Sequence, residues 1–363
     1  MALVLGLTLL LALPLYAHDA PSLSAQAAVV TADGEIIMSK NADKRLPMAS
    51  TTKIMTALVA IESGDITREV RIDRRACGVE GSSVYLTEGE VLTLEDLLYA
   101  LMLESANDAA AAIACEVGGG IAEFAEMMNR TAEKLGLWDT HFMNPHGLDD
   151  PEHYTTASDL ARLTDYALRN ETFAKIVSTY KKTIPLHGDE GVRLLLNHNR
   201  LLKQYDDVIG VKTGFTKRSG RCLVSAARRD DFTVVAVTLN APDDWKDHRA
   251  MQEYGFSLYT RRTLAKEGGI TAEIACPTAE NGIVTLTNRE ALVLCLPRDG
   301  EITYYVEAPH FVFPPVCEGE VLGRAVFCCD GREIGELPLY ASVEVPEPED
   351  ERGFFEKILG EFR

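Results

Sequence analysis

The sequence predicts an α+β fold, in which an antiparallel sheet is flanked by helices, with a helical insert. A small all-β domain and a C-terminal amphipathic helix follow. Strand patterns stand at both ends of the first part, at 27–39 and 210–239, and helical periodicity fills the segment between them. Tight turns join neighbouring strands, which is typical of antiparallel pairing. From 268 to 345 only short β-like runs separated by turns occur.

These patterns divide the chain into four predicted segments. We expect a signal peptide at 1–20, a large first domain at 21–262 and a small β-rich domain at 263–345. A linker and an amphipathic tail helix complete the chain at 346–363.

The first twenty residues favour export. Residues 2–16 are almost wholly apolar, and the small residues Ala17 and Ala20 follow. The run is shorter than the about 20 apolar residues that a membrane span requires. A signal peptide is therefore the preferred interpretation, although no Lys or Arg precedes the run; a short membrane anchor is the alternative.

Charge and cysteine content exclude some functions. With 55 acidic and 36 basic residues, the formal net charge is −19, which repels nucleic acid at long range, so we expect no nucleic-acid partner. The eight cysteines show no zinc-type spacing, so we expect no metal site. Eight cysteines allow 105 pairings, and the sequence selects none of them.

Each element of the first domain has its own local signal. Apolar runs around Ala32-Asp33-Gly34 predict a hairpin over 27–39, and Ile54, Leu58 and Ile61 predict a buried helix over 50–63. A capping box of Thr93 and Asp96 begins the next helix, 94–103. Further helices are predicted at 108–117, 121–135, 156–170 and 245–259, and strands at 210–213, 221–227 and 232–239.

The C-terminal segments are read in the same way. In the tail, apolar residues fall on one helical face, which favours peripheral contact with a membrane surface. A helix docked on the protein itself or on a partner is the alternative, because the charges of the tail balance. The apolar residues of the tail are Phe354, Phe355, Ile358, Leu359 and Phe362. The β-like runs before it are 271–275, 282–287, 291–296, 302–306, 319–328 and 333–338.

Ser50 and Lys53 form a candidate nucleophile and base. They lie one helical turn apart on the same face. A serine hydroxyl needs a neighbouring base to remove its proton, and an amine can be that base if burial or nearby positive charge lowers its pKa. Ser-x-x-Lys alone is weak, because Ser178 and Lys181 repeat it in a polar stretch.

The ordered set of three motifs is more specific. Ser50-x-x-Lys53 opens a buried helix, Ser105-x-Asn107 lies between two helices, and Lys212-Thr213-Gly214 lies on a predicted strand. This order, with Ser-Asp-Asn as the middle element, characterises β-lactamases and penicillin-binding proteins.

At these residues the chain resembles the low-molecular-mass penicillin-binding proteins of the D-alanyl-D-alanine carboxypeptidase family, the serine-type peptidases S11 of DacA/DacF type. The resemblance extends over about 27–259 and implies a β-lactamase/transpeptidase-like fold for the first domain. Four segments carry it: Leu46 to Ala57 around the nucleophile, Glu104 to Ala109, Asn144 to Asp149 and Gly210 to Gly214.

The resemblance implies a role for each site residue. Ser50 is the nucleophile, Lys53 its base, Ser105 the proton relay to the leaving amine, and Asn107 holds the substrate amide and orients Lys53. Lys212 tunes Ser105 and binds the terminal carboxylate. The binding residues implied are Thr213 for the carboxylate, Gly214, Phe215 with Ser50 for the oxyanion hole, and Arg200 as a supporting cation.

The resemblance also implies the substrate and the location. The partner is a peptidoglycan stem peptide ending in D-Ala-D-Ala, and β-lactam antibiotics are covalent inhibitors; no cofactor is required. The protein is expected outside the cytoplasm, either associated with the cell wall or membrane or secreted. One position departs from the family: where many relatives carry an arginine, ten residues before Tyr254, this chain has Asp244. Carboxylate binding then rests on Lys212 and Thr213, or substrate preference differs.

Three alternatives use the same residues or the same fold. A class A-like β-lactamase requires a glutamate for deacylation, and no Glu-x-x-Leu-Asn segment lies between Ser105 and Lys212. A D,D-endopeptidase would cut cross-links with the same machinery. A non-catalytic penicillin-binding sensor or peptidoglycan-binding module would not require the complete set of motifs.

Overall fold

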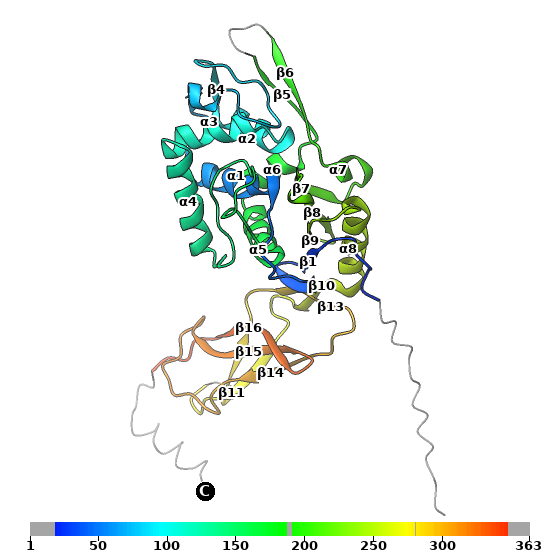
Figure 1. Cartoon of the computed structure of the whole chain (residues 1–363). Helices are drawn as coiled ribbons and strands as arrows, with labels where there is room; N and C mark the ends of the chain where they lie inside the picture. Colours follow the sequence, from blue (N-terminus) through cyan, green and yellow to red (C-terminus); the bar gives the residue numbers. More distant parts are fainter. Residues whose placement is uncertain (1–18, 187–190, 280, 348–363) are drawn as a thin grey trace, which may run out of the picture. The chain divides into compact units, whose positions relative to one another are not determined.

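The structure is a computed structural model, and it describes residues 19–186, 191–279 and 281–347 (Figure 1). The predicted signal peptide, apart from its last two residues, and the predicted tail helix lie outside the described residues. The chain divides into two compact units. One comprises the residues up to Arg228 together with Thr233–Ser257, and the other comprises Arg229–Phe232 and the residues from Leu258 onward.

A five-stranded sheet organises the first unit. Its strand order is β2-β1-β9-β8-β7, so β7 lies at one edge. β1 pairs antiparallel with β2 and with β9, and β7 pairs antiparallel with β8, as the tight turns of the sequence predict. The strands are β1 (Ala27–Ala32), β2 (Glu35–Lys40), β7 (Val208–Thr216), β8 (Gly220–Arg229) and β9 (Phe232–Leu239).

The predicted helical insert follows β2 and precedes β7. Figure 1 shows α2, α3 and α4 grouped around α1, and eight residues of α1 are buried. The predicted capping box of Thr93 and Asp96 forms at the start of α2. The helices are α1 (Lys53–Glu62), α2 (Leu94–Leu103), α3 (Asn107–Gly118), α4 (Ile121–Lys134), α5 (Ala157–Leu168) and α6 (Glu171–Ser178).

The helix predicted from Ser50 begins differently. Ala49–Thr52 form a 3-10 turn, η1, and the α-helix starts at Lys53. The hydroxyls of Thr51 and Thr52 explain the difference, because they donate back to the carbonyls of Met48 and Ala49, both at 2.7 Å. Such local bonds compete with regular helical bonding.

One part of the insert was not predicted. It contains α6, a two-stranded ribbon and the short helix α7. In α6 the buried residues Phe173, Ile176 and Val177 stand at helical spacing, so a local signal for this helix was present in the sequence. Each ribbon strand buries only one of its five residues, so the apolar–polar alternation of a half-buried strand is absent. The ribbon strands are β5 (Lys181–Pro185) and β6 (Val192–Leu196), and α7 is Leu201–Gln204.

Helices cover both faces of the large sheet. Thr31 of β1 donates to Asp165 of α5 at 2.9 Å, and Thr31 pairs with Val235. Val234, the neighbour of Val235 along β9, points to the opposite face of the sheet. On that face it meets α8 (Asp244–Leu258), because a Cβ added at Gly255 would lie 2.8 Å from the Val234 side chain. The helix α5 and the helix α8 therefore lie on opposite faces.

The second unit contains β-strands, as predicted. A five-stranded sheet has the order β11-β12-β16-β15-β14, and β10 pairs with β13. The strands are β10 (Tyr259–Ala265), β11 (Thr271–Ala275), β12 (Ile283–Thr287), β13 (Leu292–Pro297), β14 (Ile302–Glu307), β15 (Val321–Cys329) and β16 (Arg332–Ala341). Within the described ranges, no helix is long and apolar enough to cross a membrane.

A buried histidine joins α8 to the sheet. His248 is fully buried, with Nδ1 2.7 Å from Ser225 Oγ on β8 and Nε2 2.8 Å from Thr238 Oγ1 on β9. Burial lowers the pKa of His248 from 6.5 to about 3. The folded protein therefore holds this ring neutral at pH values where the unfolded chain protonates it.

This difference predicts acid sensitivity. The contribution of neutral His248 to stability is complete above pH 6.5 and is lost as the pH falls toward 3. Between pH 7 and pH 4 we expect the free energy of unfolding to fall by about 3 kcal/mol more in the wild type than in His248→Gln. Urea unfolding at the two pH values measures both losses, and equal losses would contradict the argument.

Candidate active site

Ser50 lies at the one partly open position of a buried turn. Its neighbours Ala49, Thr51, Thr52 and Lys53 are all buried, whereas Ser50 is half-buried and lines a cleft. Ala49, immediately before it, has a left-handed φ of 47°, a backbone conformation that is uncommon for a non-glycine residue. The 3-10 turn thus exposes Ser50 to the cleft, whereas the residues on either side of Ser50 pack into the core.

The amine of Lys53 is fully buried and has three polar neighbours. Its Nζ lies 3.0 Å from Ser50 Oγ, 2.7 Å from Asn107 Oδ1 and 2.6 Å from the carbonyl oxygen of His146. The amide and carbonyl oxygens can only accept hydrogen bonds, whereas the Ser50 hydroxyl can also donate. A neutral amine has two N–H donors and one lone pair, so its lone pair would face Ser50.

Burial favours that neutral form. It lowers the pKa of Lys53 well below its usual 10.5, and the charge of Lys212 lowers it further, while Asp108 acts in the opposite direction. The geometry and the electrostatics together favour a neutral amine next to the Ser50 hydroxyl.

Ser105 and Asn107 come from the connection between α2 and α3. Ser105 has a left-handed φ of 60° and lines the cleft, and Asn107 is the first residue of α3. The Asn107 side chain is fixed at both ends, because its Nδ2 donates to the carbonyl of Glu80 at 2.5 Å while its Oδ1 accepts from Lys53.

The Lys212-Thr213-Gly214 segment lies on the edge strand β7. Gly214 approaches the serine turn closely, since a side chain there would come within 3.1 Å of the Ser50 backbone nitrogen. Lys212 is buried, which lowers its pKa from 10.5 to about 7, and its Nζ donates to the carbonyl of Thr213 at 3.0 Å. Phe215, the next residue of β7, is 66% exposed.

A cavity of about 340 Å³ lies in front of Ser50. It brings together residues from the serine turn, the α2–α3 connection, β7, β8 and the start of α8. Its lining is Ser50, Ser82, Ser105, His198, Thr213, Gly214, Phe215, Arg221, Asp244 and Trp245.

The segment after α4 supports the serine turn through its backbone. The carbonyl of His146 accepts from Lys53, and the imidazole of His146 is neutral because burial lowers its pKa to about 3. Gly147 has a φ of 88°, and a Cβ there would lie 1.9 Å from the carbonyl oxygen of Ala49. A glycine is therefore required at this contact.

Arg200 contacts a residue of the cleft wall. Its guanidinium carbon lies 4.7 Å from the ring centroid of Trp245, whose side chain lines the cleft. Sequence reasoning missed four other cleft residues, which are Ser82, His198, Arg221 and Trp245. His198 lies two positions before Arg200 and its Nε2 is 3.2 Å from Glu104 Oε2.

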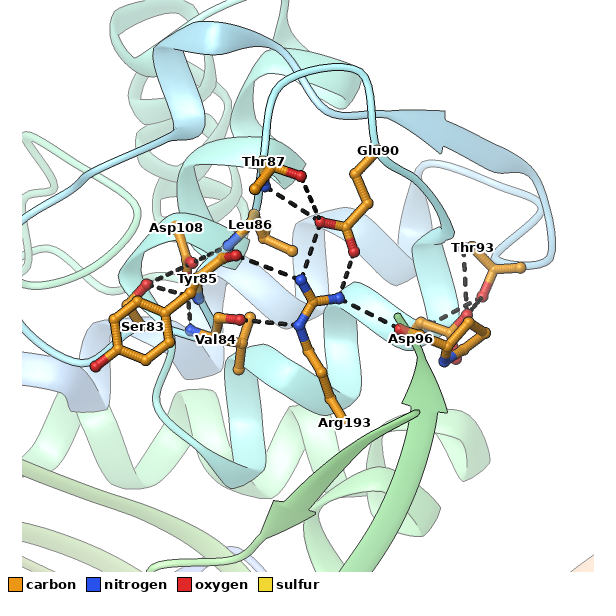
Figure 2. A network of polar contacts seen from close by, with 11 residues as sticks. Ser83, Val84, Tyr85, Leu86, Thr87, Glu90, Thr93, Asp96, Asp108 and Arg193 are labelled. Atoms are coloured by element: carbon orange, nitrogen blue, oxygen red, sulfur yellow. Dashed lines mark hydrogen bonds and ion pairs between the residues drawn. The ribbon is translucent and has the colours of Figure 1, made fainter. Parts of the chain in front are cut away.

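A polar network behind Asn107 was also missed (Figure 2). The backbone nitrogen of Asn107 donates to the carbonyl of Ser82 at 2.7 Å. The carboxylate of Asp108, which is fully buried, accepts from Ser83 Oγ at 2.6 Å and from the backbone nitrogens of Val84 and Leu86 at 3.2 and 3.0 Å. Asp108, the residue after Asn107 in α3, therefore binds the loop that contacts Asn107.

Arg193 of β6 fastens the far end of this loop. It forms an ion pair with the buried Glu90 and donates from Nε to the carbonyl of Val84 at 2.9 Å (Figure 2). Burial alone would raise the pKa of Glu90, but hydrogen bonds from Arg193 and Thr87 outweigh it and lower the pKa. The unpredicted ribbon thus supports the loop that positions Asn107.

Comparisons with known proteins identify the family of the chain. A family model described as D-alanyl-D-alanine carboxypeptidase, Peptidase_S11, matches residues 15–243. The chain is 32% identical over 343 residues to D-alanyl-D-alanine carboxypeptidase DacF of Bacillus subtilis (strain 168), covering 91% of this chain and 86% of that protein. It is 31% identical over 374 residues to DacC of Escherichia coli (strain K12), covering 94% and 88%.

Solved structures confirm the predicted fold class. Penicillin binding protein 5 from Haemophilus influenzae superposes with a TM-score of 0.71 at 27% identity, covering 90% of this chain and 99% of that one. The DD-transpeptidase of Streptomyces K15 superposes with a TM-score of 0.62 at 33% identity, covering 66% and 99%.

The ion pair of Glu90 and Arg193 predicts a stability effect. Arg193→Met would leave the carboxylate of Glu90 buried without its cation, so we expect a loss of about 3 kcal/mol in the free energy of unfolding. Urea unfolding measures the loss. Arg71→Met is the matched control, because Arg71 is exposed and donates to Gly89 of the same loop at 3.3 Å. A loss equal to that of the control would contradict a supporting role for the pair.

Proposed function

The chain belongs to the D-alanyl-D-alanine carboxypeptidase family, and on this premise we propose that it removes the terminal D-alanine from peptidoglycan stem peptides through an acyl-enzyme on Ser50. The observation that carries the proposal is the contact of the buried Lys53 amine with Ser50 Oγ at 3.0 Å, at the base of an open cleft. The protein would bind penicillins at the same serine.

Acylation begins with proton transfer from Ser50 to Lys53. The hydroxyl oxygen attacks the carbonyl carbon of the penultimate D-alanine, and the amine takes the proton. Support for this role is the pKa of Lys53, which burial lowers well below its usual 10.5 and which therefore favours the neutral amine. Asn107 keeps the amine oriented through its Oδ1 and presents its amide to the substrate.

The developing oxyanion would be stabilised by two backbone N–H groups, those of Ser50 and Phe215. The close approach of β7 to the serine turn at Gly214 supports this assignment, because Gly214 precedes Phe215 and packs against the Ser50 nitrogen. A larger residue at 214 would separate the two donors.

Expulsion of D-alanine requires a proton for the leaving amine. Ser105 would relay it, with Lys212 tuning the hydroxyl of Ser105 and Thr213 binding the substrate carboxylate. Support comes from the position of Ser105 and Thr213 on the same cleft as Ser50. Lys212 precedes Thr213 on β7, and its buried Nζ donates to the carbonyl of Thr213. Arg200 would act only through Trp245.

Water then hydrolyses the ester on Ser50 and releases the shortened peptide. A class A-like β-lactamase would hold a glutamate for this step. Among the described residues that line the cleft, the acidic one is Asp244, and it pairs with Arg221 at 3.0 Å. We therefore favour slow release of a penicilloyl group over rapid β-lactam turnover.

The substrate also suggests where the protein works. We propose export through the predicted signal peptide and action in the cell wall, with peripheral membrane contact through the amphipathic tail. The support is the apolar run of residues 2–16 and the apolar face at 354–362.

Ser50→Ala tests the nucleophile. Wild-type protein exposed to penicillin should gain the mass of one penicillin, and Ser50→Ala should gain none, because the acylated oxygen is absent. D-Alanine release from a diacyl-D-Ala-D-Ala peptide should fall at least about a thousandfold. Ser178→Ala is the matched control, since Ser178 belongs to the second Ser-x-x-Lys and its Oγ donates to the carbonyl of Lys175. A penicilloyl adduct on Ser50→Ala would refute the assignment, and rapid loss of the wild-type adduct would favour the β-lactamase alternative.

Lys53→Arg tests the base. Arginine keeps a positive charge but does not lose its proton in proteins, so it cannot accept the proton of Ser50. We expect the penicillin acylation rate to fall about 100- to 10,000-fold. In the wild type this rate should rise with pH at values well below 10.5, because the neutral amine is the active form and its pKa is lowered. Stopped-flow acylation at several pH values measures both effects, with thermal unfolding to confirm the fold of the variant. Retention of wild-type rates would exclude Lys53 as the base.

A further inference from the structure

The cleft must select a free C-terminus, given the proposed function on which this inference rests. A terminal carboxylate requires hydrogen-bond donors that also carry positive charge. The lysines of the site fit this task poorly, because Lys53 is fully buried among three partners and Lys212 is 2% exposed with its Nζ on the Thr213 carbonyl. Burial also lowers the pKa of Lys212 to about 7, so its charge is only partial near neutral pH.

Arg221 is a permanent cation on the same cleft. It is the second residue of β8 and pairs directly with Phe215 of β7 in the antiparallel register. Paired residues project from the same face of a sheet, and Thr213, two positions before Phe215, shares that face. Arg221, Phe215 and Thr213 all line the cavity in front of Ser50, and the Arg221 side chain is 44% exposed.

The start of α8 holds this guanidinium in place. Arg221 Nε lies 3.0 Å from Asp244 Oδ1, and the guanidinium carbon lies 5.9 Å from the ring centroid of Trp245. Asp244 is 3% exposed and its Oδ1 also accepts from the backbone nitrogen of Trp245 at 2.9 Å. The carboxylate that orients Arg221 is therefore itself fixed and shielded from solvent.

Only one edge of the Arg221 guanidinium is occupied. Within the part of the chain that the structure describes, its ion pair with Asp244 runs from Nε, and its Nη1 and Nη2 groups form no hydrogen bond. Two parallel N–H donors of an arginine match the two oxygens of a carboxylate.

We propose that Arg221 binds the terminal carboxylate of the leaving D-alanine, and that Asp244 is a positioning residue that aims it. The Thr213 hydroxyl on the same face supplies a further donor. This arrangement makes Arg221 a specificity residue, because only a leaving group with a free carboxylate beside its amine offers the guanidinium a partner. The enzyme should then prefer leaving groups that carry this carboxylate over leaving groups that lack it.

Two reactive substrates separate charge recognition from catalysis. Both are N-acyl-D-alanyl thioesters; one has thioglycolate as its leaving group and the other has the uncharged ethyl ester of thioglycolate. We expect Arg221→Gln to lower kcat/KM about 10- to 100-fold for the charged substrate and less than about twofold for the neutral one. Arg228→Gln is the matched control, because Arg228 is on the same strand and its Nε donates to Thr233 Oγ1.

The outcomes separate this inference from the proposed function. Equal losses on both substrates would mean that Arg221 only supports the fold around Asp244, and this result would overturn the inference. A variant that still prefers the charged substrate over the neutral one as strongly as the wild type does would also overturn it. Turnover of neither thioester by the wild type, together with absence of a penicilloyl adduct on Ser50, would refute both the proposed function and the inference. If Arg221→Gln fails to fold, Arg221→Lys replaces it, because lysine keeps the charge without the two parallel donors. The decrease in kcat/KM of Arg221→Lys must again be confined to the charged substrate.

Discussion

The buried amine of Lys53 is the interaction on which the site depends. A charged ammonium is unfavourable in the core, so burial favours the neutral amine, and this supports the proposed role of Lys53 as the base for Ser50. This works only while Asn107 and the His146 carbonyl occupy both N–H groups, because the lone pair then faces the hydroxyl. Each of these acceptors comes from a different segment of the insert. The helical insert is therefore as important to the chemistry as the sheet.

Holding those segments together requires unusual backbone conformations. Ala49 and Ser105 both adopt a left-handed φ beside the cleft, at 47° and 60°. Such conformations persist only where the surrounding contacts determine them. For Ser105 the contacts include α3, which Asp108 ties to the loop 80–90, and Arg193 of β6 binds the same loop through Glu90 (Figure 2). Stability and catalysis thus share the same polar network.

The sequence reveals the parts of the site whose residues are close along the chain. Ser50 and Lys53 lie within one turn, and most helices and strands have periodic patterns that match their observed bounds. The pair of Glu90 and Arg193 joins positions 103 residues apart and leaves no local pattern. Arg221 could have been found by counting, because the turn at 216–220 places it opposite Phe215. Arg200 stays a prediction, and the structure places its guanidinium over the ring of Trp245, a residue of the cleft wall.

The charge of the whole protein explains why recognition of an anionic substrate must be local. A net charge of −19 repels a carboxylate at long range, but salt screens that repulsion beyond about 10 Å. Inside the cleft the nearby charges dominate, and of these Asp244 is committed to Arg221. Because Asp244 is shielded from solvent, it orients the guanidinium while the exposed edge of Arg221 still offers two donors. An acidic residue at the cleft is therefore compatible with binding an acidic terminus, since its role is to position the cation rather than to meet the substrate.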